Sequence, residues 1–390
     1  MNEITPITSA PASTSLLDYP QRIALVFRIL LNCGFFGASL PLVQAMVVRM
    51  RIPKRIIEDA LAILQEEGSV ELRDGQYRRV YRVQQGQQKT VRQRIAVLTD
   101  RSIFTHYYEV YQDYLMGMAE VFDVAGFDLL FSHEAVGVEG KLIAIEEMSQ
   151  SGTRGVAFMG ACEPEVRSIL RAKGIPTVLC GNSTIEQRDF GCVCSDNIFG
   201  IKNLVHHLLR IGHKQIGFYT TSALSHDGYH HRFIGYRDAM YEAGLPTNEK
   251  MLQTEHHTAS SSNKAAGVFT RMPVKERPTA IVCACDRDAF ELISELEKSG
   301  IKVPRDVSVA GFENSFFNIF SQTELTTVDI FPREMGRIAA GFLINEVKEP
   351  QLPARIILPS RLIERGSVQP LGGTLEKDVL SGAVKTARIF

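Results

Sequence analysis

The chain has 390 residues, of which 45% are hydrophobic and 22% are charged, and its formal net charge at pH 7 is −1. This length is enough for two or three domains of ~100–200 residues, and the composition is ordinary for a soluble globular protein. The charge balance excludes a histone-like or polyanionic chain. Residues 1–90 hold 11 Lys and Arg against 8 Asp and Glu, a net +3, which mildly favours a nucleic-acid contact near the N-terminus.

Neither the cysteines nor the apolar stretches indicate a secreted or membrane protein. There are 7 cysteines, an odd number, and residues 1–19 lack the basic start and the apolar run of a secretory signal. Residues 29–48 carry no charge over a length that could cross a bilayer, but they include Asn32, Pro41 and Gln44, which a lipid-facing helix seldom combines. We therefore expect a cytoplasmic protein without a membrane span.

The N-terminal part has the pattern of helices followed by a β-hairpin. A Ser-, Thr- and Pro-rich segment, residues 1–18, is expected to be a disordered tail. Apolar residues at helical spacing, with Pro53 at a first turn, predict helices over residues 21–31, 42–50 and 53–67. Asp74-Gly75 then stands between strand-like runs at 69–73 and 77–83, a strong hairpin signal. Residues 19–83 are therefore predicted to form a winged helix-turn-helix.

The rest of the chain alternates between strands and helices. A Gln-rich polar segment at 84–93 is expected to be a linker. Beyond it, the predicted strands of a first half cover residues 94–100, 127–132, 155–160 and 176–181. The predicted helices between them cover residues 107–125, 141–149 and 163–173. This alternation is typical of βαβ units in a parallel sheet.

The alternation restarts after Asp196, which predicts a second half. Asp196 can cap a helix that ends at Gly212, and residues 215–219 follow as a strand. We expect an α/β body of two doubly wound parallel-sheet lobes over residues 94–368, followed by an irregular tail at 369–390. The expected lobes are residues 94–183 with 322–348, and residues 184–321 with 349–368.

A series of motifs in this body resembles the LacI/GalR family of sugar-responsive transcriptional regulators. The pattern DN-x-x-G, HL-x-x-x-GH-x-x-I and R-x-x-GY covers Asp196, Asn197, Gly200, His207, Leu208, Gly212, His213, Ile216, Arg232, Gly235 and Tyr236. Further matching stretches, in the family's order, are residues 278–289, 300–314, 325–328 and 362–368. The resemblance implies a periplasmic-binding-protein-like body of type I that binds a small effector, a sugar or sugar derivative, at the carboxyl ends of its strands.

The same resemblance suggests which residues contact the effector. Arg232 is the first candidate, because a guanidinium can clamp hydroxyls or a carboxylate in a bidentate way, although a surface helix arginine is the alternative. Asp286 matches the family's acceptor Asp, with helix capping as its alternative, while Cys285 replaces the family's Asn. Tyr111 could stack on a sugar face or simply pack in a helix core. Weaker candidates on expected rim loops are His226, His257 and Glu313.

The N-terminal segment is similar to the GntR-type DNA-binding domain over about 60 residues, at 40–41, 51–61 and 64–70. By that analogy the helix from Pro53 enters the major groove of operator DNA. The implied DNA contacts are Arg49, Arg51, Lys54, Arg55, Arg73, Arg78 and Arg79. Glu58 and Asp59 depart from the family, and they either face away from DNA, which we expect, or accept from cytosine. A protein-binding winged helix is the alternative.

No metal, cofactor or catalytic site is predicted. Cys192 with Cys194 and Cys283 with Cys285 could each present two thiolates, but both pairs fall on predicted buried strands, where cysteine is an ordinary core residue. We find no nucleophile elbow and no phosphate loop. The sequence therefore predicts a homodimeric, effector-controlled regulator, with the layout of arabinose-responsive regulators. A solute-binding receptor is the alternative, and an enzyme is not expected.

Overall fold

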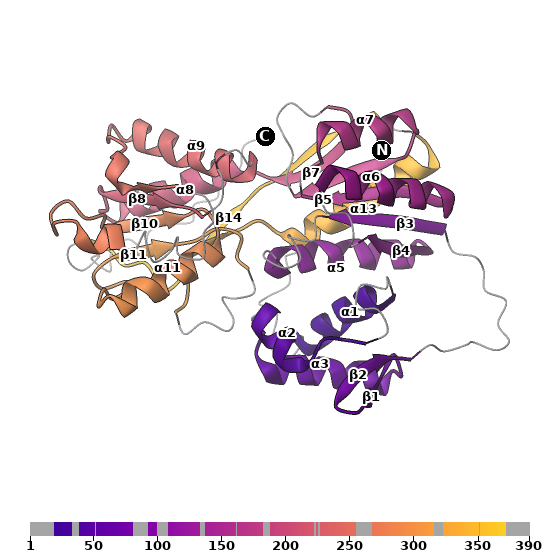
Figure 1. The fold of residues 1–390 in the computed structure, drawn as a ribbon. Helices are drawn as coiled ribbons and strands as arrows, with labels where there is room; N and C mark the ends of the chain where they lie inside the picture. The colour runs from indigo at the N-terminus through magenta and orange to yellow at the C-terminus, as the bar shows by residue number, and fades with distance from the viewer. Residues whose placement is uncertain are drawn as a thin grey trace, which may run out of the picture. The chain divides into compact units, whose positions relative to one another are not determined.

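Figure 1 shows the fold of the chain, a computed structural model. The structure describes residues 19–32, 39–50, 52–80, 93–99, 108–132, 137–160, 162–181, 188–221, 224, 227–254, 267–315, 323–350 and 352–371. The chain divides into two compact units and passes between them three times. The first unit comprises Met1–Cys194 and Pro332–Ile357, and the second comprises Ser195–Phe331 and Leu358–Phe390.

The N-terminal elements are three helices and a hairpin, as the sequence predicted. They are α1 (Tyr19–Asn32), α2 (Val43–Met50), α3 (Lys54–Glu66), β1 (Val70–Arg73) and β2 (Gln76–Arg79). Asp74 and Gly75 both have positive φ, 51° and 74°, which is the backbone that a two-residue hairpin turn requires. Helix α3 is amphipathic, with its buried residues at Ile57, Ala60, Leu61 and Leu64.

One strand contact in this part was not predicted. Ser39 forms an isolated antiparallel bridge with Arg78, and the amide of Leu40 donates to the carbonyl of Tyr77 at 2.9 Å. The sequence indicated only a break here, because the partner strand is almost 40 residues away. The apolar stretch at 29–48 is divided between α1 and α2, and no helix in the described part of the chain is long and apolar enough to cross a membrane.

The first unit contains a six-stranded sheet in the order β13-β7-β6-β5-β3-β4. Its strands are β3 (Gln93–Thr99), β4 (Phe127–Ser132), β5 (Thr153–Met159), β6 (Thr177–Gly181), β7 (Gly191–Ser195) and β13 (Arg355–Leu358). Strands β3 to β7 pair in parallel, and their order is that of a doubly wound sheet. The helices of this unit are α5 (Tyr108–Val124), α6 (Gly137–Gln150), α7 (Pro164–Ala172) and α13 (Pro332–Lys348).

Helices α5 and α13 pack backbone to backbone. A Cβ on Gly117 of α5 would overlap the carbonyl oxygen of Arg333, and a Cβ on Gly336 of α13 would overlap that of Tyr114. Only glycine permits so close an approach. Next to this crossing, Arg337 Nε donates to Glu120 Oε2 at 2.8 Å, so an ion pair joins the two helices beside their glycines.

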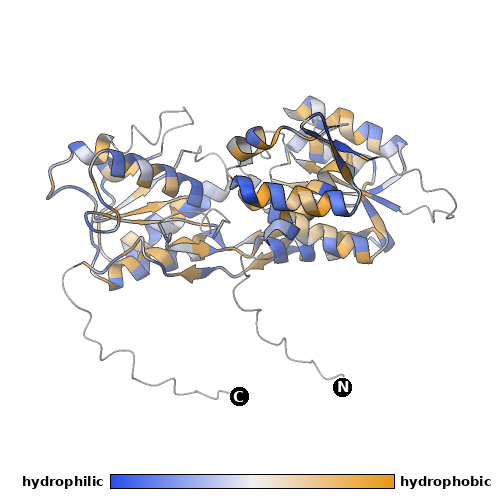
Figure 2. Cartoon of the chain, turned by 90° about the horizontal axis from the view of Figure 1, so that it is seen from below, coloured by the Kyte–Doolittle hydropathy of each residue, from blue (hydrophilic) through white to orange (hydrophobic). Residues whose placement is uncertain are grey.

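The second unit contains a four-stranded parallel sheet in the order β11-β10-β8-β9. Its strands are β8 (Ile216–Tyr219), β9 (Leu252–Gln253), β10 (Ala280–Cys283) and β11 (Ser308–Ala310). Figure 1 shows α8 (Asn197–Arg210) and α9 (Asp227–Glu242) on one side of this sheet and α11 (Asp286–Lys298) on the other. A short helix η2 (Glu249–Met251) precedes β9, and β12 (Thr327–Asp329) pairs antiparallel with β14 (Arg361–Ile363). Figure 2 shows the sheet strands as mostly hydrophobic and the helices as banded, as expected for buried sheets under amphipathic helices.

The motif that carries the family resemblance has a structural basis in this unit. The side chain of Asp196 caps α8 by accepting from the amide of Phe199 at 2.9 Å, as the sequence predicted. Gly235 lets α9 approach α8, because a Cβ there would lie 2.5 Å from the carbonyl oxygen of Ile198. The buried hydroxyl of Tyr236 donates to the carbonyl of Ile216 at 2.7 Å and so ties α9 to β8.

Four expected boundaries differ from those observed. The expected changes of lobe at 321/322 and 348/349 instead fall at Phe331/Pro332 and Ile357/Leu358, so β12 lies in the second unit and β13 joins the first sheet. Strand β7 pairs with β6 of the first unit, although residues 184–194 were expected in the second lobe. The expected tail also begins too early, because residues 369–371 are held by the second unit. His213 Nε2 donates to the carbonyl of Gln369 at 2.9 Å, and the amide of Leu371 donates to that of Ile211 at 2.9 Å.

Candidate effector site and DNA-binding residues

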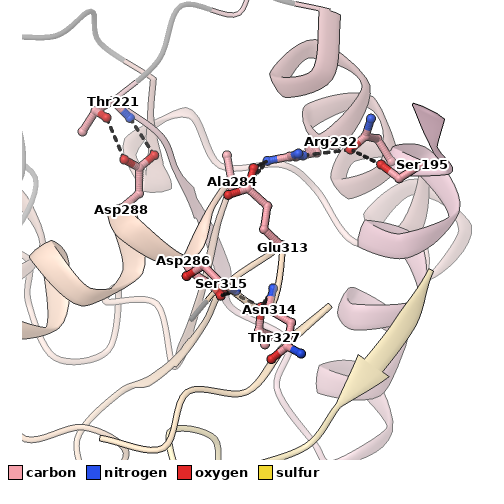
Figure 3. A network of polar contacts seen from close by, with 11 residues as sticks. Ser195, Thr221, Arg232, Ala284, Asp286, Asp288, Glu313, Asn314, Ser315 and Thr327 are labelled. Atoms are coloured by element: carbon pink, nitrogen blue, oxygen red, sulfur yellow. Dashed lines mark hydrogen bonds and ion pairs between the residues drawn. The ribbon is translucent and has the colours of Figure 1, made fainter. Parts of the chain in front are cut away.

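The candidate effector residues gather in the second unit, where β8 and β10 end and α9 and α11 begin (Figure 3). The carboxyl edge of a parallel sheet is the usual place for a small ligand in an open α/β fold. Arg232 comes from the second turn of α9, and Asp286 is the first residue of α11. Glu313 follows β11. The structure therefore brings together three of the predicted effector residues: Arg232, Asp286 and Glu313.

Arg232 lies at the centre of a buried polar network. Its side chain is only 6% exposed. Nη1 lies 2.8 Å from Glu313 Oε1 and donates to the carbonyl of Ala284 at 2.7 Å, while Nε donates to Asn197 Oδ1 at 2.9 Å. The guanidinium carbon also lies 4.3 Å from the ring centroid of Phe312. The planar guanidinium is thus held on several sides, so the alternative that Arg232 is an arginine on the helix surface is wrong.

Glu313 is the carboxylate partner of this arginine, and its backbone is strained. Its φ is 105°, a region that residues with a side chain rarely adopt and that often marks functional positions. Burial raises the pKa of Glu313, and Arg232 counteracts that rise only in part. Burial alone would lower the pKa of Arg232, but Glu313, Tyr229 and Cys285 together outweigh burial, so the pKa of Arg232 is raised. The two groups form a buried ion pair in which the arginine stays charged.

Asp286 holds the segment that carries Glu313. Its side chain is completely buried, its Oδ2 accepts from the amide of Ser315 at 2.7 Å, and its Oδ1 accepts from the hydroxyl of Thr327. A Cβ at Gly311 would run into the same carboxylate, so this position needs glycine. The helix cap is Cys285 rather than Asp286. Asp286 therefore links α11 to the backbone after β11 and to β12, a role that the sequence did not suggest.

Sequence reasoning missed Asp288 and did not assign a role to Asn197. Asp288 is completely buried and accepts from the amide and the hydroxyl of Thr221, at 3.0 and 2.7 Å, which fixes the chain just after β8. Asn197, at the start of α8, accepts the hydrogen bond from Arg232 Nε with its Oδ1. The Ser195 hydroxyl lies 3.4 Å from the same oxygen. The D-x-D pattern of 286–288 was the available signal for Asp288.

The remaining predicted effector residues are Tyr111, His226 and His257. Tyr111 lies on α5 of the first unit, where it is half-buried with its ring centroid 5.6 Å from that of Tyr114, an edge-to-face contact. This position fits the packing alternative and does not bear on a ligand role. His226 and His257 lie outside the described residues.

Four of the predicted DNA-binding cations of α3 and the hairpin lie close to a carboxylate. Four ion pairs are formed, with N–O distances of 3.2, 3.9, 2.8 and 3.6 Å, by Lys54–Glu58, Arg55–Asp59, Arg73–Glu71 and Arg78–Asp74. Arg79 is half-buried. The side chain of Arg49 and all of Arg51 lie outside the part of the chain that the structure describes.

The six cysteines that the structure describes are core residues. Cys162, Cys180, Cys192, Cys194, Cys283 and Cys285 are buried and free. Burial raises the pKa of Cys162 to about 12, which makes its thiol a poor metal ligand or nucleophile at neutral pH. Within the described residues, no group of three or more His, Cys, Asp or Glu could hold a metal ion.

Known proteins are similar to this chain over much of its length. A family profile described as a periplasmic binding protein-like domain matches residues 205–368. The transcriptional regulator RegA of Clostridium saccharobutylicum is 25% identical over 265 residues, which cover 66% of this chain and 78% of RegA. The repressor CytR of Escherichia coli is 27% identical over 218 residues, covering 56% of this chain and 63% of CytR.

Solved structures show the same fold. The transcription regulator CcpA of Lactococcus lactis superposes with a TM-score of 0.63 at 19% identity, covering 71% of this chain and all of that chain (100%). A LacI family regulator from Enterococcus faecium with bound ribose superposes with a TM-score of 0.61 at 20% identity, covering 72% and 100%. The chain is therefore a transcriptional regulator with a LacI-family-like, periplasmic-binding-protein-like effector-binding domain, and its relatives are regulators rather than enzymes.

Proposed function

We propose that the chain is a cytoplasmic, homodimeric repressor whose affinity for operator DNA is controlled by a sugar-like effector. Residues 19–80 would bind the operator as a winged helix of the GntR type, and the network around Arg232 would bind the effector. The observation that carries the effector part is the buried Arg232–Glu313 pair at the carboxyl end of a parallel sheet. Such a pair offers donors and acceptors side by side, which suits vicinal hydroxyl groups.

The proposed DNA-binding part rests on the order and pairing of its elements. Three helices are followed by a hairpin, and the Ser39–Arg78 bridge adds a third strand-like segment between α1 and α2. This arrangement is the outline of a winged helix, in which α3 would enter the major groove and the β1–β2 hairpin would be the wing. A two-fold dimer would contact two half-sites with its two copies of residues 19–80. The number of phosphate contacts would therefore be twice that of one weakly basic domain.

In this proposal, DNA binding is controlled by contacts that lie close to the positions where the chain crosses from one unit to the other. Arg232 donates to Asn197, which lies close after the crossing at Cys194/Ser195. Glu313 forms an isolated β-bridge with Asp329, which lies just before the crossing at Phe331/Pro332. An effector hydroxyl that replaced either partner of Arg232 would alter the chain at these points. A ligand with different affinities for two arrangements of the units would then shift their populations, which is the mechanism that we propose.

A thermal-shift screen tests the effector site. The full chain would be heated with monosaccharides, sugar acids and sugar phosphates, because a ligand at 100 times its Kd stabilises the folded state by about 2.7 kcal/mol. We expect a hit that Arg232→Lys abolishes, since Lys cannot reproduce the fork, and that Arg237→Ala retains, because Arg237 is exposed on the same helix. A hit that survives Arg232→Lys would contradict the proposed site.

The solute-binding receptor is distinguished by DNA binding. A receptor would give the same hit in the thermal screen but would not bind duplex DNA. A repressor binds duplex DNA with an affinity that falls steeply as salt is raised. Fluorescence anisotropy of the full chain with labelled duplex DNA at several salt concentrations separates the two functions.

A further inference from the structure

The exposed face of α3 carries both acidic and basic side chains, and this combination limits which surfaces the helix can recognise. The buried residues of α3 are Ile57, Ala60, Leu61 and Leu64. Its exposed residues in the first two turns are Lys54, Arg55, Glu58 and Asp59. The side chains of these four are 64%, 91%, 48% and 49% exposed.

The angular positions around the helix show that Glu58 cannot be turned away from a partner that Lys54 and Arg55 touch. At 100° per residue, Arg55 lies about 100° from Lys54, and Glu58 lies about 40° from Lys54, between the two cations. Asp59 lies about 140° from Lys54, at the edge of the exposed stripe. Any surface that meets both cations therefore also meets Glu58, which for this residue favours the alternative of a DNA contact over the expectation that both acids face away.

A carboxylate in this position has a defined complement in duplex DNA. In the major groove, the cytosine amino group is a donor that Glu or Asp can accept, whereas phosphates and guanine edges repel a carboxylate. Glu58 Oε1 lies 3.2 Å from Lys54 Nζ. A carboxylate has about four lone-pair sites, so Glu58 can accept from Lys54 and from a base at the same time.

We propose that Glu58 is a specificity-determining residue that accepts from the amino group of a cytosine in the major groove. This inference rests on the proposed DNA-binding function of residues 19–80. Arg55 donates to the guanine edge of a neighbouring G·C pair, and Asp59 stays at the margin of the contact. Because Glu58 repels phosphates, it also weakens binding to DNA that lacks the cytosine. The operator half-site therefore contains a C·G pair that the protein requires.

The test is a selection of duplex DNA from a randomised library with the full-length chain, followed by affinity measurements on single-base variants of the selected site. For the wild-type chain we expect one C·G position at which substitution weakens binding about 5- to 150-fold, the range for a good base contact. Glu58→Gln should reduce this discrimination at that position alone. It should also strengthen binding to random duplex, because a charge that repels phosphates has been removed.

Asp59→Asn is the matched control, since it removes the same charge from the adjacent residue at the edge of the stripe. It should strengthen binding to random duplex while leaving the discrimination at the C·G position intact. Loss of that discrimination to the same extent in both variants, or its retention in Glu58→Gln, would overturn the assignment of Glu58. Absence of any duplex binding by the wild-type chain at low salt would instead refute the proposed function itself. Both substitutions are at exposed positions, and circular dichroism melting checks that the variants are folded.

Discussion

Removing one partner of the Arg232–Glu313 pair should be among the most damaging single changes in the second unit. The two side chains are 6% and 12% exposed and 2.8 Å apart, so Glu313→Gln leaves the guanidinium buried with no compensating charge. Breaking a buried ion pair in this way costs about 3–5 kcal/mol. The cost of Arg232→Met should be similar, because a buried carboxylate is then left unpaired.

A double-mutant cycle isolates the interaction. Glu313→Gln, Arg232→Met and the double variant would be unfolded with urea and followed by circular dichroism, because the chain has no Trp to serve as a fluorescent probe. We expect the double variant to be much less destabilised than the sum of the single variants, since no charge is left unpaired. Glu242→Gln, which breaks an exposed pair with Lys202, is the control and should change little. Additive effects at Arg232 and Glu313 would refute the buried pair.

Three further substitutions test other parts of the fold. Gly336→Ala should destabilise the chain by about 1–3 kcal/mol in thermal unfolding, because its Cβ meets backbone of α5, whereas Gly341→Ala, with open space around it, should not. Asp286→Ala should cost about 1–3 kcal/mol for each buried donor it leaves without an acceptor, measured by urea unfolding, and it should weaken effector binding because it frees the segment of Glu313. Burial lowers the pKa of His213 below 6.5, so stability should fall as pH drops below 6.5, and His213→Gln should flatten that dependence.

Local signals in the sequence predicted most of the elements. The Asp74-Gly75 hairpin and the Asp196 cap depend on residues within a few positions of each other, and both are present. The alternation of strands and helices also predicted two parallel sheets, because each element is encoded by its own periodicity. The resemblance then indicated Arg232 as a residue of the second unit, beside the ends of β8 and β10.

Contacts between distant residues could not be predicted in the same way. Asp286 meets Ser315 and Thr327, which are 29 and 41 positions away, and Asp288 meets Thr221 at a separation of 67. Nothing local distinguishes such a carboxylate from one that faces a ligand. The position of β7 in the first sheet likewise depends on strand pairing, which a single segment does not encode. The 3.6-residue period of α3 defines its charged exposed face as well as its buried face, but the prediction from sequence considered the buried face alone.

The most direct test of the whole account is the affinity of the full chain for its selected operator, measured with and without a saturating effector from the thermal screen. Coupling between two sites is typically 5- to 150-fold in affinity. We predict a change of operator Kd in this range for the wild-type chain and for Arg237→Ala, and no change for Arg232→Lys. An effector that binds the wild-type chain at saturation and leaves the operator Kd unaltered would contradict control of DNA binding through this site.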